Sequence, residues 1–261
     1  MPELPDVEAF REVLADCAQG RLVRRVDVRD SGVLNGVDAP RLRRELAGRR
    51  LAAPYRHGKW LFAPTDGPTV LFHFGMTGSL LCPEPGEPLA RHDRVVLTFA
   101  DEVELRYRDQ RKLKGLWLAD PATADRTVAE EGPDALTVGR KGFEAALTGR
   151  RARIKAVLTD QSALAGLGNL LADEILWRAR LHPARATDHL SREDRDRLHR
   201  AMRRTLREAV RAGRVPPRPS WLTGHRDGEG ETCPRCGTEL SRGRVAGRGT
   251  VWCPHCQPAD D

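Results

Sequence analysis

Cys233-Pro-Arg-Cys236 and Cys253-Pro-His-Cys256 are two Cys-x2-Cys pairs separated by sixteen residues, and they decide the fold of the carboxyl-terminal end. Four thiolates on two tight turns suit the tetrahedral coordination of Zn²⁺, and a four-sulfur shell leaves no open position for catalysis. The spacing therefore predicts one structural Zn²⁺ ion that holds a small β-hairpin together in residues 221–261. His255 could replace a cysteine as ligand, although we expect it to face solvent or a phosphate.

The alternative for these four cysteines is a pair of disulfides. No signal peptide precedes the chain, and the remaining cysteines, Cys17 and Cys82, are scattered singly, as expected of reduced thiols. No run approaches the roughly eighteen apolar residues that span a bilayer. We therefore expect a cytoplasmic protein with zinc, not disulfides, and without a membrane partner.

Positive charge is concentrated in one part of the 261-residue chain. The formal net charge is +7, yet residues 140–218 hold 19 Lys or Arg against 9 Asp or Glu, which gives that stretch +10. Such concentration favours a polyanionic partner whose binding releases counterions and weakens with salt. The alternative is a set of solvated helix faces, which the alternating charges of residues 191–204 partly fit.

The amino-terminal half is typical of a β-sandwich or barrel preceded by a helix. Apolar residues recur at helical spacing over residues 6–19, and Gly20 follows as a stop signal. Short alternating segments bounded by turn signals predict six strands, at residues 22–28, 59–63, 70–74, 95–99, 103–107 and 116–118. We expect a β-sandwich domain over residues 1–122, and a linker over residues 123–139 because no periodicity survives there.

The pattern becomes helical from Gly142 onward. Four helices are expected, at residues 143–147, 154–158, 170–180 and 192–212. Gly213 should end the last of them, and a stiff proline-rich connector then leads to the cysteine hairpin. Residues 140–220 thus form an all-α domain, and the whole chain is of the α+β class.

Gly166-Leu-Gly168-Asn169 forms a double turn between two of these helices. Both glycines can take positive φ, and Asn169 can cap the following helix. Exposed N–H groups and the helix dipole make such a turn a ready anion site, which a DNA backbone can approach closely. The alternative is a plain helical hairpin inside a core.

Pro2 becomes the amino-terminal residue if Met1 is removed. An α-amino group has a pKa of about 8, against about 10.4 for lysine, so at neutral pH it is far more often neutral and nucleophilic. A secondary amine can form only a cationic iminium with a sugar C1′, and that cation is an electron sink for elimination. Many chains begin with Met-Pro for no chemical reason, so this signal is weak when taken alone.

Taken in order, these motifs resemble one family. Pro2-Glu3-Leu4-Pro5, the Lys59 segment, His73-Phe-Gly-Met76-Thr-Gly-Ser, the double turn and the four-cysteine hairpin together look like the formamidopyrimidine-DNA glycosylase and endonuclease VIII family of base-excision repair. The resemblance spans nearly the whole chain. It implies a monomeric, zinc-containing DNA glycosylase and abasic-site lyase that acts on damaged double-stranded DNA and associates with the nucleoid.

The resemblance implies roles for four residues at the reaction centre. Pro2 would attack C1′ of a flipped nucleotide, expel the base, and cleave the strand by β,δ-elimination through a Schiff base. Glu3 would help to open the sugar ring and move protons, although a helix-start carboxylate is its structural alternative. Lys59 would hold a phosphate at the centre. Glu174 would support the geometry, or be a salt-bridge partner.

The resemblance also implies a set of DNA contacts. Residues that match phosphate or other DNA contacts are Asn169, Arg248, Lys155 and His92. Residues that match the side chains inserted into the space left by the flipped base are Met76, Arg111 and Leu113. Leu113 stands where the 8-oxoguanine enzymes usually have phenylalanine. The alternatives are surface charge for the basic residues and a sheet-core position for Met76.

The segment between Gly213 and Cys233 departs from the pattern of enzymes that excise oxidised purines. Those enzymes carry a longer segment there, which caps the flipped base. We therefore expect an open base site and weak or absent 8-oxoguanine excision. Two other classes are a non-catalytic zinc-containing binder of damaged or abasic DNA, which tolerates Met1, and a zinc-dependent RNA-binding or ribosome-binding protein, which has no use for Pro2-Glu3.

Overall fold

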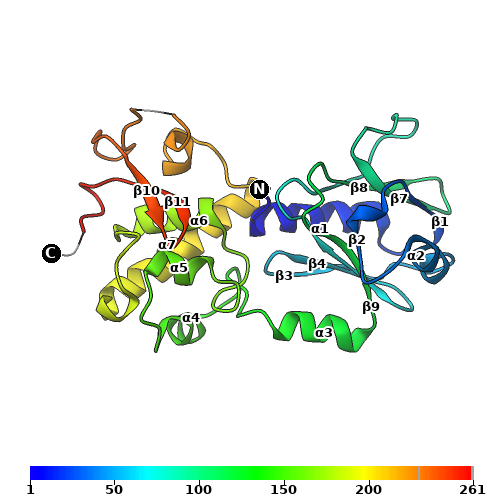
Figure 1. Cartoon of the computed structure of the whole chain (residues 1–261), viewed down its shortest axis with the longest axis horizontal. Helices are drawn as coiled ribbons and strands as arrows, with labels where there is room; N and C mark the ends of the chain where they lie inside the picture. Colours follow the sequence, from blue (N-terminus) through cyan, green and yellow to red (C-terminus); the bar gives the residue numbers. More distant parts are fainter. Residues whose placement is uncertain (229, 260–261) are drawn as a thin grey trace. The chain divides into compact units, whose positions relative to one another are not determined.

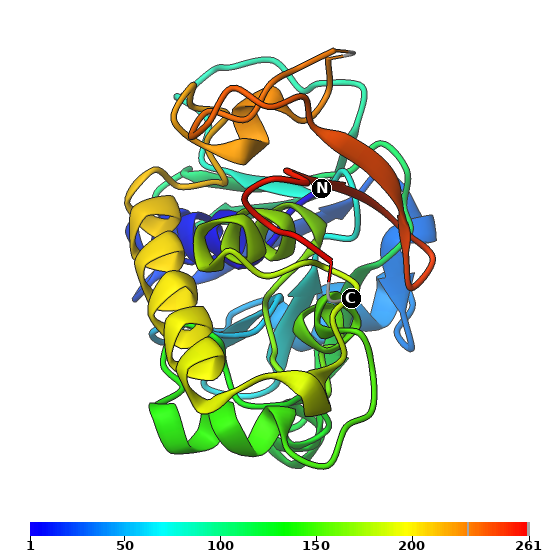
Figure 2. The same cartoon turned by 90° about the vertical axis from the view of Figure 1, so that its left-hand side faces the viewer.

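The computed structural model describes residues 1–228 and 230–259 (Figures 1 and 2). The chain divides into two compact units. The amino-terminal unit contains Met1–Pro2 and Asp6–Glu130, and the carboxyl-terminal unit contains Glu3–Pro5 and the chain from Glu131 onward. Each unit has its own hydrophobic core.

The amino-terminal unit contains two β-sheets. One has four antiparallel strands in the order β1 (Val23–Val28), β7 (Asp93–Phe99), β8 (Glu104–Arg108) and β6 (Ser79–Leu81). The other has the order β2 (Leu34–Asn35), β9 (Gly115–Ala119), β5 (Thr69–His73), β4 (Trp60–Pro64) and β3 (Tyr55–His57). Side chains of both sheets share one core with α1 (Leu4–Ala18). The predicted sandwich and opening helix are confirmed.

Two helices of this unit were not expected. Asp38 caps the short α2 (Ala39–Leu46), which buries Leu42 and Leu46, a single pair of apolar residues one turn apart. Asp120 caps α3 (Pro121–Ala129), which lies partly in the stretch predicted to be a linker. Residues 123–129 of that stretch are therefore helical. Ala124 of α3 packs on the five-stranded sheet, so a tertiary contact supports a helix that its sequence specifies weakly.

The two single cysteines are also a correction. Cys17, in the last turn of α1, and Cys82, directly after β6, form a disulfide. They are 65 residues apart in the chain, and their Cα atoms lie 5.9 Å apart. The expectation of two isolated reduced thiols is wrong, because nothing in their spacing reveals that the fold brings them together.

The carboxyl-terminal unit is helical and ends in a hairpin. Its helices are α4 (Arg140–Leu147), α5 (Ile154–Thr159), α6 (Asn169–Ala179) and α7 (Arg192–Arg211). It also has short 3-10 turns at Thr187–His189 and Leu222–His225, and the amino-terminal unit has one at Ser31–Val33. A capping box of Ser191 and Asp194 begins α7, and Gly213, at φ 66°, follows its end. The hairpin pairs β10 (Ser241–Val245) with β11 (Arg248–Trp252). The predicted helices are confirmed.

No helix among the residues described is both long and apolar enough to cross a membrane.

Candidate functional site

Glu3 is fully buried at the amino-terminal end of α6. Its carboxylate accepts hydrogen bonds from the backbone N–H groups of Gly168 at 2.9 Å, Leu170 at 2.8 Å and Leu171 at 3.1 Å. A Cβ atom on Gly168 would lie 2.2 Å from Glu3 Cδ. The double turn is therefore built around the Glu3 carboxylate. These hydrogen bonds fix the position of Glu3, the residue directly after Pro2.

This arrangement corrects two expectations about the double turn. The anion at the start of α6 is the carboxylate of Glu3, so the donors expected to bind a phosphate are already in use. Gly168 is the residue that precedes the helix, and Asn169 is its first residue, so Asn169 does not cap it. Positive φ is found at Gly166, at 108°, but not at Gly168.

Asn169 faces the zinc hairpin. Its side-chain Nδ2 donates to the carbonyl of Gly249 at 2.9 Å, while its buried Oδ1 has no hydrogen-bond partner among the residues described. Arg248, the residue before Gly249, is exposed where β11 begins, after a turn with positive φ at Ala246 and Gly247. Two of the predicted phosphate contacts thus belong to segments that are joined by a hydrogen bond.

Lys155, which the resemblance places among the DNA contacts, is buried and does not contact solvent. Its side chain is 0% exposed, and its Nζ lies 2.6 Å from Asp173 Oδ1 and donates to Thr250 Oγ1 at 2.7 Å. Burial, with Arg226 and Arg248 adding repulsion, lowers the pKa of Lys155 from its ordinary value. A buried ammonium group needs a carboxylate partner. Lys155 therefore supports the hairpin from inside.

One backbone carbonyl connects these residues. Gly249 O accepts from Lys155 Nζ at 3.1 Å and from Arg226 Nη2 at 3.0 Å, as well as from Asn169. Arg226 is also paired with Asp173. A carbonyl oxygen has two lone pairs, so these three donors share one acceptor.

Glu174 is also fully buried, on α6. It pairs with Arg178 at 2.8 Å and accepts from the backbone N–H of Thr223 at 3.2 Å. Burial raises the pKa of Glu174, and the bonds to Arg178 and Thr223 oppose this rise. These contacts are those of the salt-bridge partner, which was the structural alternative for this residue.

Met76, Arg111 and Leu113 gather on two adjoining loops of the amino-terminal unit. Arg111 Nη1 lies 3.1 Å from Met76 Sδ, and Met76 and Leu113 are 40% and 51% exposed. Asp109 joins the loops, because its Oδ1 accepts from Thr77 Oγ1 at 2.6 Å and from the backbone N–H of Arg111 at 3.1 Å. Exposed apolar side chains on a braced support fit a role in filling a gap in a base stack.

The other two predicted contacts lie in the same unit. Lys59, in the β3–β4 turn, is close enough to His73 to lower the pKa of the imidazole. The larger causes are burial and then Lys114, and together they bring the pKa of His73 to about 4. His92 Nδ1 lies 3.1 Å from Arg94 Nη2, and its backbone carbonyl accepts from Asp109.

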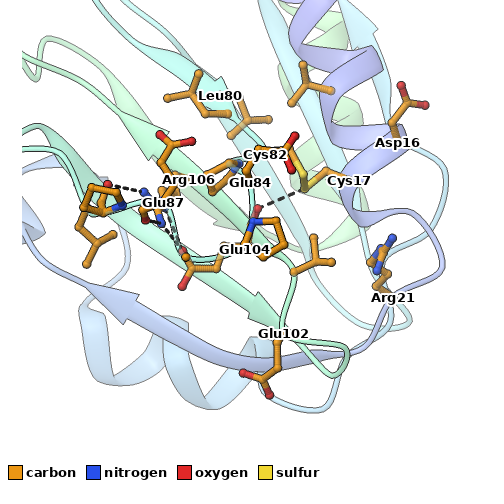
Figure 3. Close-up of a pocket in the computed structure, with 18 residues that line it drawn as sticks. Asp16, Cys17, Arg21, Leu80, Cys82, Glu84, Glu87, Glu102, Glu104 and Arg106 are labelled. Carbon is orange, nitrogen blue, oxygen red and sulfur yellow. Dashed lines mark hydrogen bonds and ion pairs between the residues drawn. A yellow bond between two sulfur atoms is a disulfide. The ribbon is translucent and has the colours of Figure 1, made fainter.

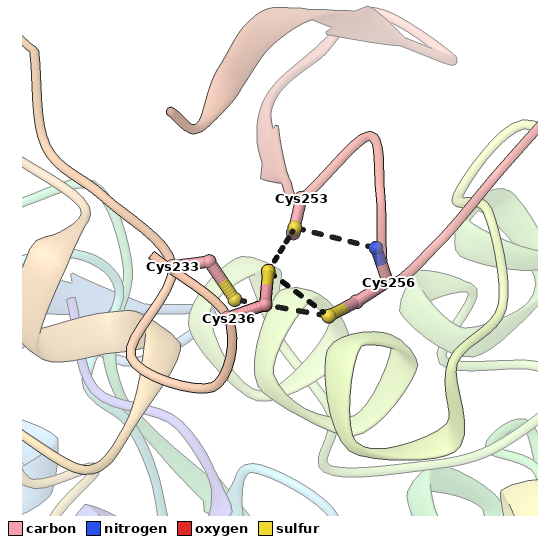
Figure 4. A group of neighbouring side chains, drawn as sticks. All are labelled: Cys233, Cys236, Cys253 and Cys256. Atoms are coloured by element: carbon pink, nitrogen blue, oxygen red, sulfur yellow. Dashed lines mark hydrogen bonds between the residues drawn. The ribbon is translucent and has the colours of Figure 1, made fainter. Parts of the chain in front are cut away.

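The four hairpin cysteines form a site that fits zinc (Figure 4). Sulfur–sulfur distances are 3.5 Å for Cys236–Cys253 and for Cys236–Cys256, and 4.0 Å for Cys233–Cys256. A tetrahedron with Zn–S bonds of about 2.3 Å has edges of about 3.8 Å. Trp177 Nε1 donates to Cys233 Sγ at 3.3 Å, a bond that orients this ligand.

His255 is exposed and outside this cluster, so all four ligands are sulfur. The predicted four-cysteine zinc site is confirmed. The closed shell gives the metal a structural role.

Three functional candidates were missed by sequence reasoning: Asp173, Arg226 and His73. Asp173 and Arg226 form the ion pair that fastens α6 to the segment before the cysteines. Neither belongs to a motif with fixed spacing, so only the fold reveals the pair. His73, the imidazole with the lowered pKa, lies within the quoted His73-Phe-Gly-Met76 motif.

Three family models match the chain: the formamidopyrimidine-DNA glycosylase N-terminal domain over residues 1–116, its H2TH domain over 131–216, and a zinc finger found in FPG and IleRS over 230–259. A formamidopyrimidine-DNA glycosylase of Symbiobacterium thermophilum is 37% identical, covering 100% of this chain and 90% of that protein. The corresponding enzyme of Thermomicrobium roseum is 36% identical, covering 99% of both chains.

Solved structures agree. The Lactococcus lactis Fpg in complex with DNA containing an abasic site superposes with a TM-score of 0.88 at 29% identity, covering 99% of this chain and 100% of that chain. MutM in complex with DNA containing carbocyclic 8-oxo-G gives 0.89 at 28% identity, with the same coverage.

Fold, zinc site and relatives together define a DNA repair glycosylase with a helix–two-turn–helix domain and a zinc finger. The chain belongs to the formamidopyrimidine-DNA glycosylase family, whose members are DNA glycosylases with abasic-site lyase activity.

Proposed function

We propose that this enzyme removes a damaged base and cuts the strand by covalent catalysis at Pro2. After loss of Met1, the proline nitrogen attacks C1′ of the flipped nucleotide, and the base leaves with a proton. The resulting iminium draws electrons from the sugar, so the 3′-phosphate leaves by β-elimination and the 5′-phosphate by δ-elimination. The observation that carries this proposal is the fixation of the adjoining Glu3 by three backbone N–H groups.

Glu3 is proposed to handle protons at the sugar ring. A carboxylate held by three donors cannot swing between rotamers, so its orientation is set before substrate binds. Such pre-organisation is the usual requirement for a general acid or base. Glu174, with its oxygens occupied by Arg178 and Thr223, is proposed to stabilise α6 only.

DNA is proposed to be held by its backbone and separated at the lesion by side chains. Lys59, Asn169 and Arg248 supply phosphate contacts, with His92 as an additional contact, and these contacts give affinity without reading sequence. Met76, Arg111 and Leu113 occupy the gap left by the flipped nucleotide. We propose that the enzyme acts as a monomer on double-stranded DNA of the nucleoid.

The base site is proposed to be open. Trp221 is buried, Thr223 is bonded to Glu174, and Arg226 is paired with Asp173, so the segment before the cysteines is fastened within its own unit. A fastened segment is a poor cap for a flipped base. Ring-opened purines, oxidised pyrimidines or bulky alkylated bases are the proposed substrates, with little excision of 8-oxoguanine.

The deciding experiment uses purified protein and duplexes that carry different damaged bases or an abasic site, with borohydride present. Borohydride reduces an iminium to a stable amine, so covalent protein–DNA adducts should appear. Pro2→Gly should lose the adduct of the secondary amine and most of the lyase activity. A mature terminus that keeps Met1, or no adduct with an abasic duplex, favours the alternative, a non-catalytic binder of damaged DNA. Efficient 8-oxoguanine release opposite cytosine would contradict the open base site alone.

A further inference from the structure

A cavity of about 940 Å³ opens in the amino-terminal unit beside the Cys17–Cys82 disulfide (Figure 3). Its walls are the end of α1, strand β6, the proline-rich segment that follows Cys82, and the β7–β8 turn. None of the predicted catalytic or DNA-binding residues lines it. The role of this cavity is therefore separate from that of the site described above.

The two sulfur-bearing residues differ in exposure. Cys17 is 3% exposed, whereas Cys82 is exposed. Cys17 Sγ lies 3.3 Å from the backbone carbonyl of Glu104. A disulfide sulfur has no proton to donate, but a reduced Cys17 thiol can donate to this carbonyl. The site thus accommodates the oxidised and the reduced form, and only Cys82 is open to attack.

The charge of the cavity is negative. Five carboxylates line it, against two guanidinium groups. Arg106 is paired with Glu104 at 2.7 Å, Arg24 with Glu102, and Arg21 with Asp101. The remaining lining carboxylates that take part in no hydrogen bond or ion pair within residues 1–228 and 230–259 are Asp16, Glu84 and Glu87. Glu87 also interacts with Arg108 through its charge, so Asp16 and Glu84 carry most of the negative field that a charged molecule meets when it approaches Cys82 from the cavity.

We propose that Cys82 is a reversible thiol–disulfide exchange site, with Cys17 as its resolving thiol, and that it reacts faster with cationic small thiols and disulfides than with anionic ones. In the reductive direction, a thiolate attacks Cys82 Sγ, a mixed disulfide forms, and Cys17 leaves as a thiolate and takes up a proton. A second thiolate attacks the sulfur of the small molecule, which releases Cys82 and a small-molecule disulfide. The two small thiols are oxidised and the protein disulfide is reduced.

The test uses the full-length, zinc-loaded protein with two redox couples, cationic cysteamine with cystamine and anionic glutathione with its disulfide. Exchange is quenched with an alkylating agent, and peptide mass spectrometry assigns each adduct. Each rate is divided by the rate for an unstructured cyclic peptide disulfide, which removes the intrinsic reactivity of the thiol. A chromogenic chelator reports any zinc release, so that reaction of the hairpin cysteines is counted separately.

We expect normalised exchange to be about tenfold faster with cysteamine at low ionic strength, and this preference should disappear at about 0.5 M salt. Adducts should form on Cys82. Cys17→Ser should keep a cystamine-derived mixed disulfide on Cys82, because no resolving thiol remains, whereas Cys82→Ser should leave Cys17 almost unreacted because it is buried.

Charge variants separate steering from reactivity. Asp16→Asn with Glu84→Gln should remove most of the preference for cysteamine, whereas Asp125→Asn, at an exposed position on α3 outside the cavity, should leave it unchanged. Equal normalised rates at all salt concentrations, adducts mainly on Cys17, or a Cys17–Cys82 pair inert to both couples would overturn the proposal. Glycosylase activity is not the readout, so these results stand apart from the test of Pro2.

Discussion

The contact between Glu3 and Gly168 shows how a residue can restrict which amino acid fits at a position far along the chain. Only a residue without a Cβ lets the Glu3 carboxylate approach the start of α6, because an added Cβ would lie 2.2 Å from Glu3 Cδ. The Glu3 carboxylate takes the place of a capping side chain, because Gly168, the residue that precedes α6, has no side chain to cap it. The group that caps α6 is therefore the carboxylate to which we assign proton handling in the proposed mechanism.

Gly168→Ala should displace Glu3 and slow strand cleavage by about a hundredfold. A carboxylate moved by about an ångström no longer addresses the sugar, while most of the fold remains. The measurement is single-turnover cleavage of an abasic duplex, with thermal unfolding in parallel. Gly139→Ala is the matched control, because that glycine also precedes a helix and has nothing within 4 Å of an added Cβ. Equal rates for the two variants would contradict the role of this contact.

His73 should stay neutral down to about pH 4, the value to which burial, Lys114 and Lys59 lower its pKa. The unfolded chain binds this proton below about pH 6.5, so the folded state loses stability as pH falls from 6.5 toward 4, by at most about 3 kcal/mol. NMR titration of the imidazole and urea unfolding at several pH values would measure both effects. In His73→Asn this part of the pH dependence of stability should vanish. A measured His73 pKa near 6.5 would contradict the prediction that burial and the two lysines lower it.

At the scale of elements, α5, α6 and the zinc hairpin are joined by a buried charge network. Lys155 from α5, Asp173 from α6 and Arg226 from the segment before the cysteines converge on the tip of β11. The zinc shell closes the base of the same hairpin. Two independent devices thus hold Arg248 and Asn169, one by metal coordination and the other by ion pairs.

Asp173→Asn should destabilise the protein by about 3 to 5 kcal/mol, because it leaves a buried Lys155 without its carboxylate. Chemical denaturation followed by fluorescence would measure this, and zinc content should stay at one ion per chain. Asp196→Asn removes a carboxylate that pairs with the exposed Arg140, and should change stability by less than about 1 kcal/mol. A small effect at Asp173 would mean that the network is not needed for folding.

At the scale of the whole molecule, cysteines stabilise the two units in different ways. A disulfide crosslinks the amino-terminal unit, while four thiols hold a metal site in the carboxyl-terminal unit. A crosslink over 65 residues restricts the unfolded chain, and a metal site couples ligand binding to folding. A reductant should therefore lower the stability of the amino-terminal unit, and a zinc chelator that of the carboxyl-terminal unit.

A non-chelating phosphine reductant should lower the stability of the amino-terminal unit by about 4 kcal/mol, and a zinc chelator should unfold the hairpin and abolish DNA binding. Hydrogen exchange read by mass spectrometry would assign each effect to its residues. Cys82→Ser should reproduce only the first effect and Cys236→Ser only the second. Identical exchange patterns for the two treatments would contradict separate stabilisation.

Local sequence determined much of this protein. The spacing of Cys233, Cys236, Cys253 and Cys256 specified the metal site, because coordination geometry demands a fixed separation of ligands. Periodicity placed the long helices and most strands, since burial of one face imposes it. Helices α2 and α3 escaped detection because each is short and gains its support from packing.

Tertiary structure decided what no local pattern encodes. It paired Cys17 with Cys82, placed the Glu3 carboxylate rather than a phosphate at the start of α6, and buried Lys155 against Asp173. Each outcome depends on which groups the folded chain brings within a few ångströms, and hydrogen bonds, ion pairs and sulfur bonds act only at that range. The sequence therefore specified which chemical groups are present, and the fold specified which of them interact.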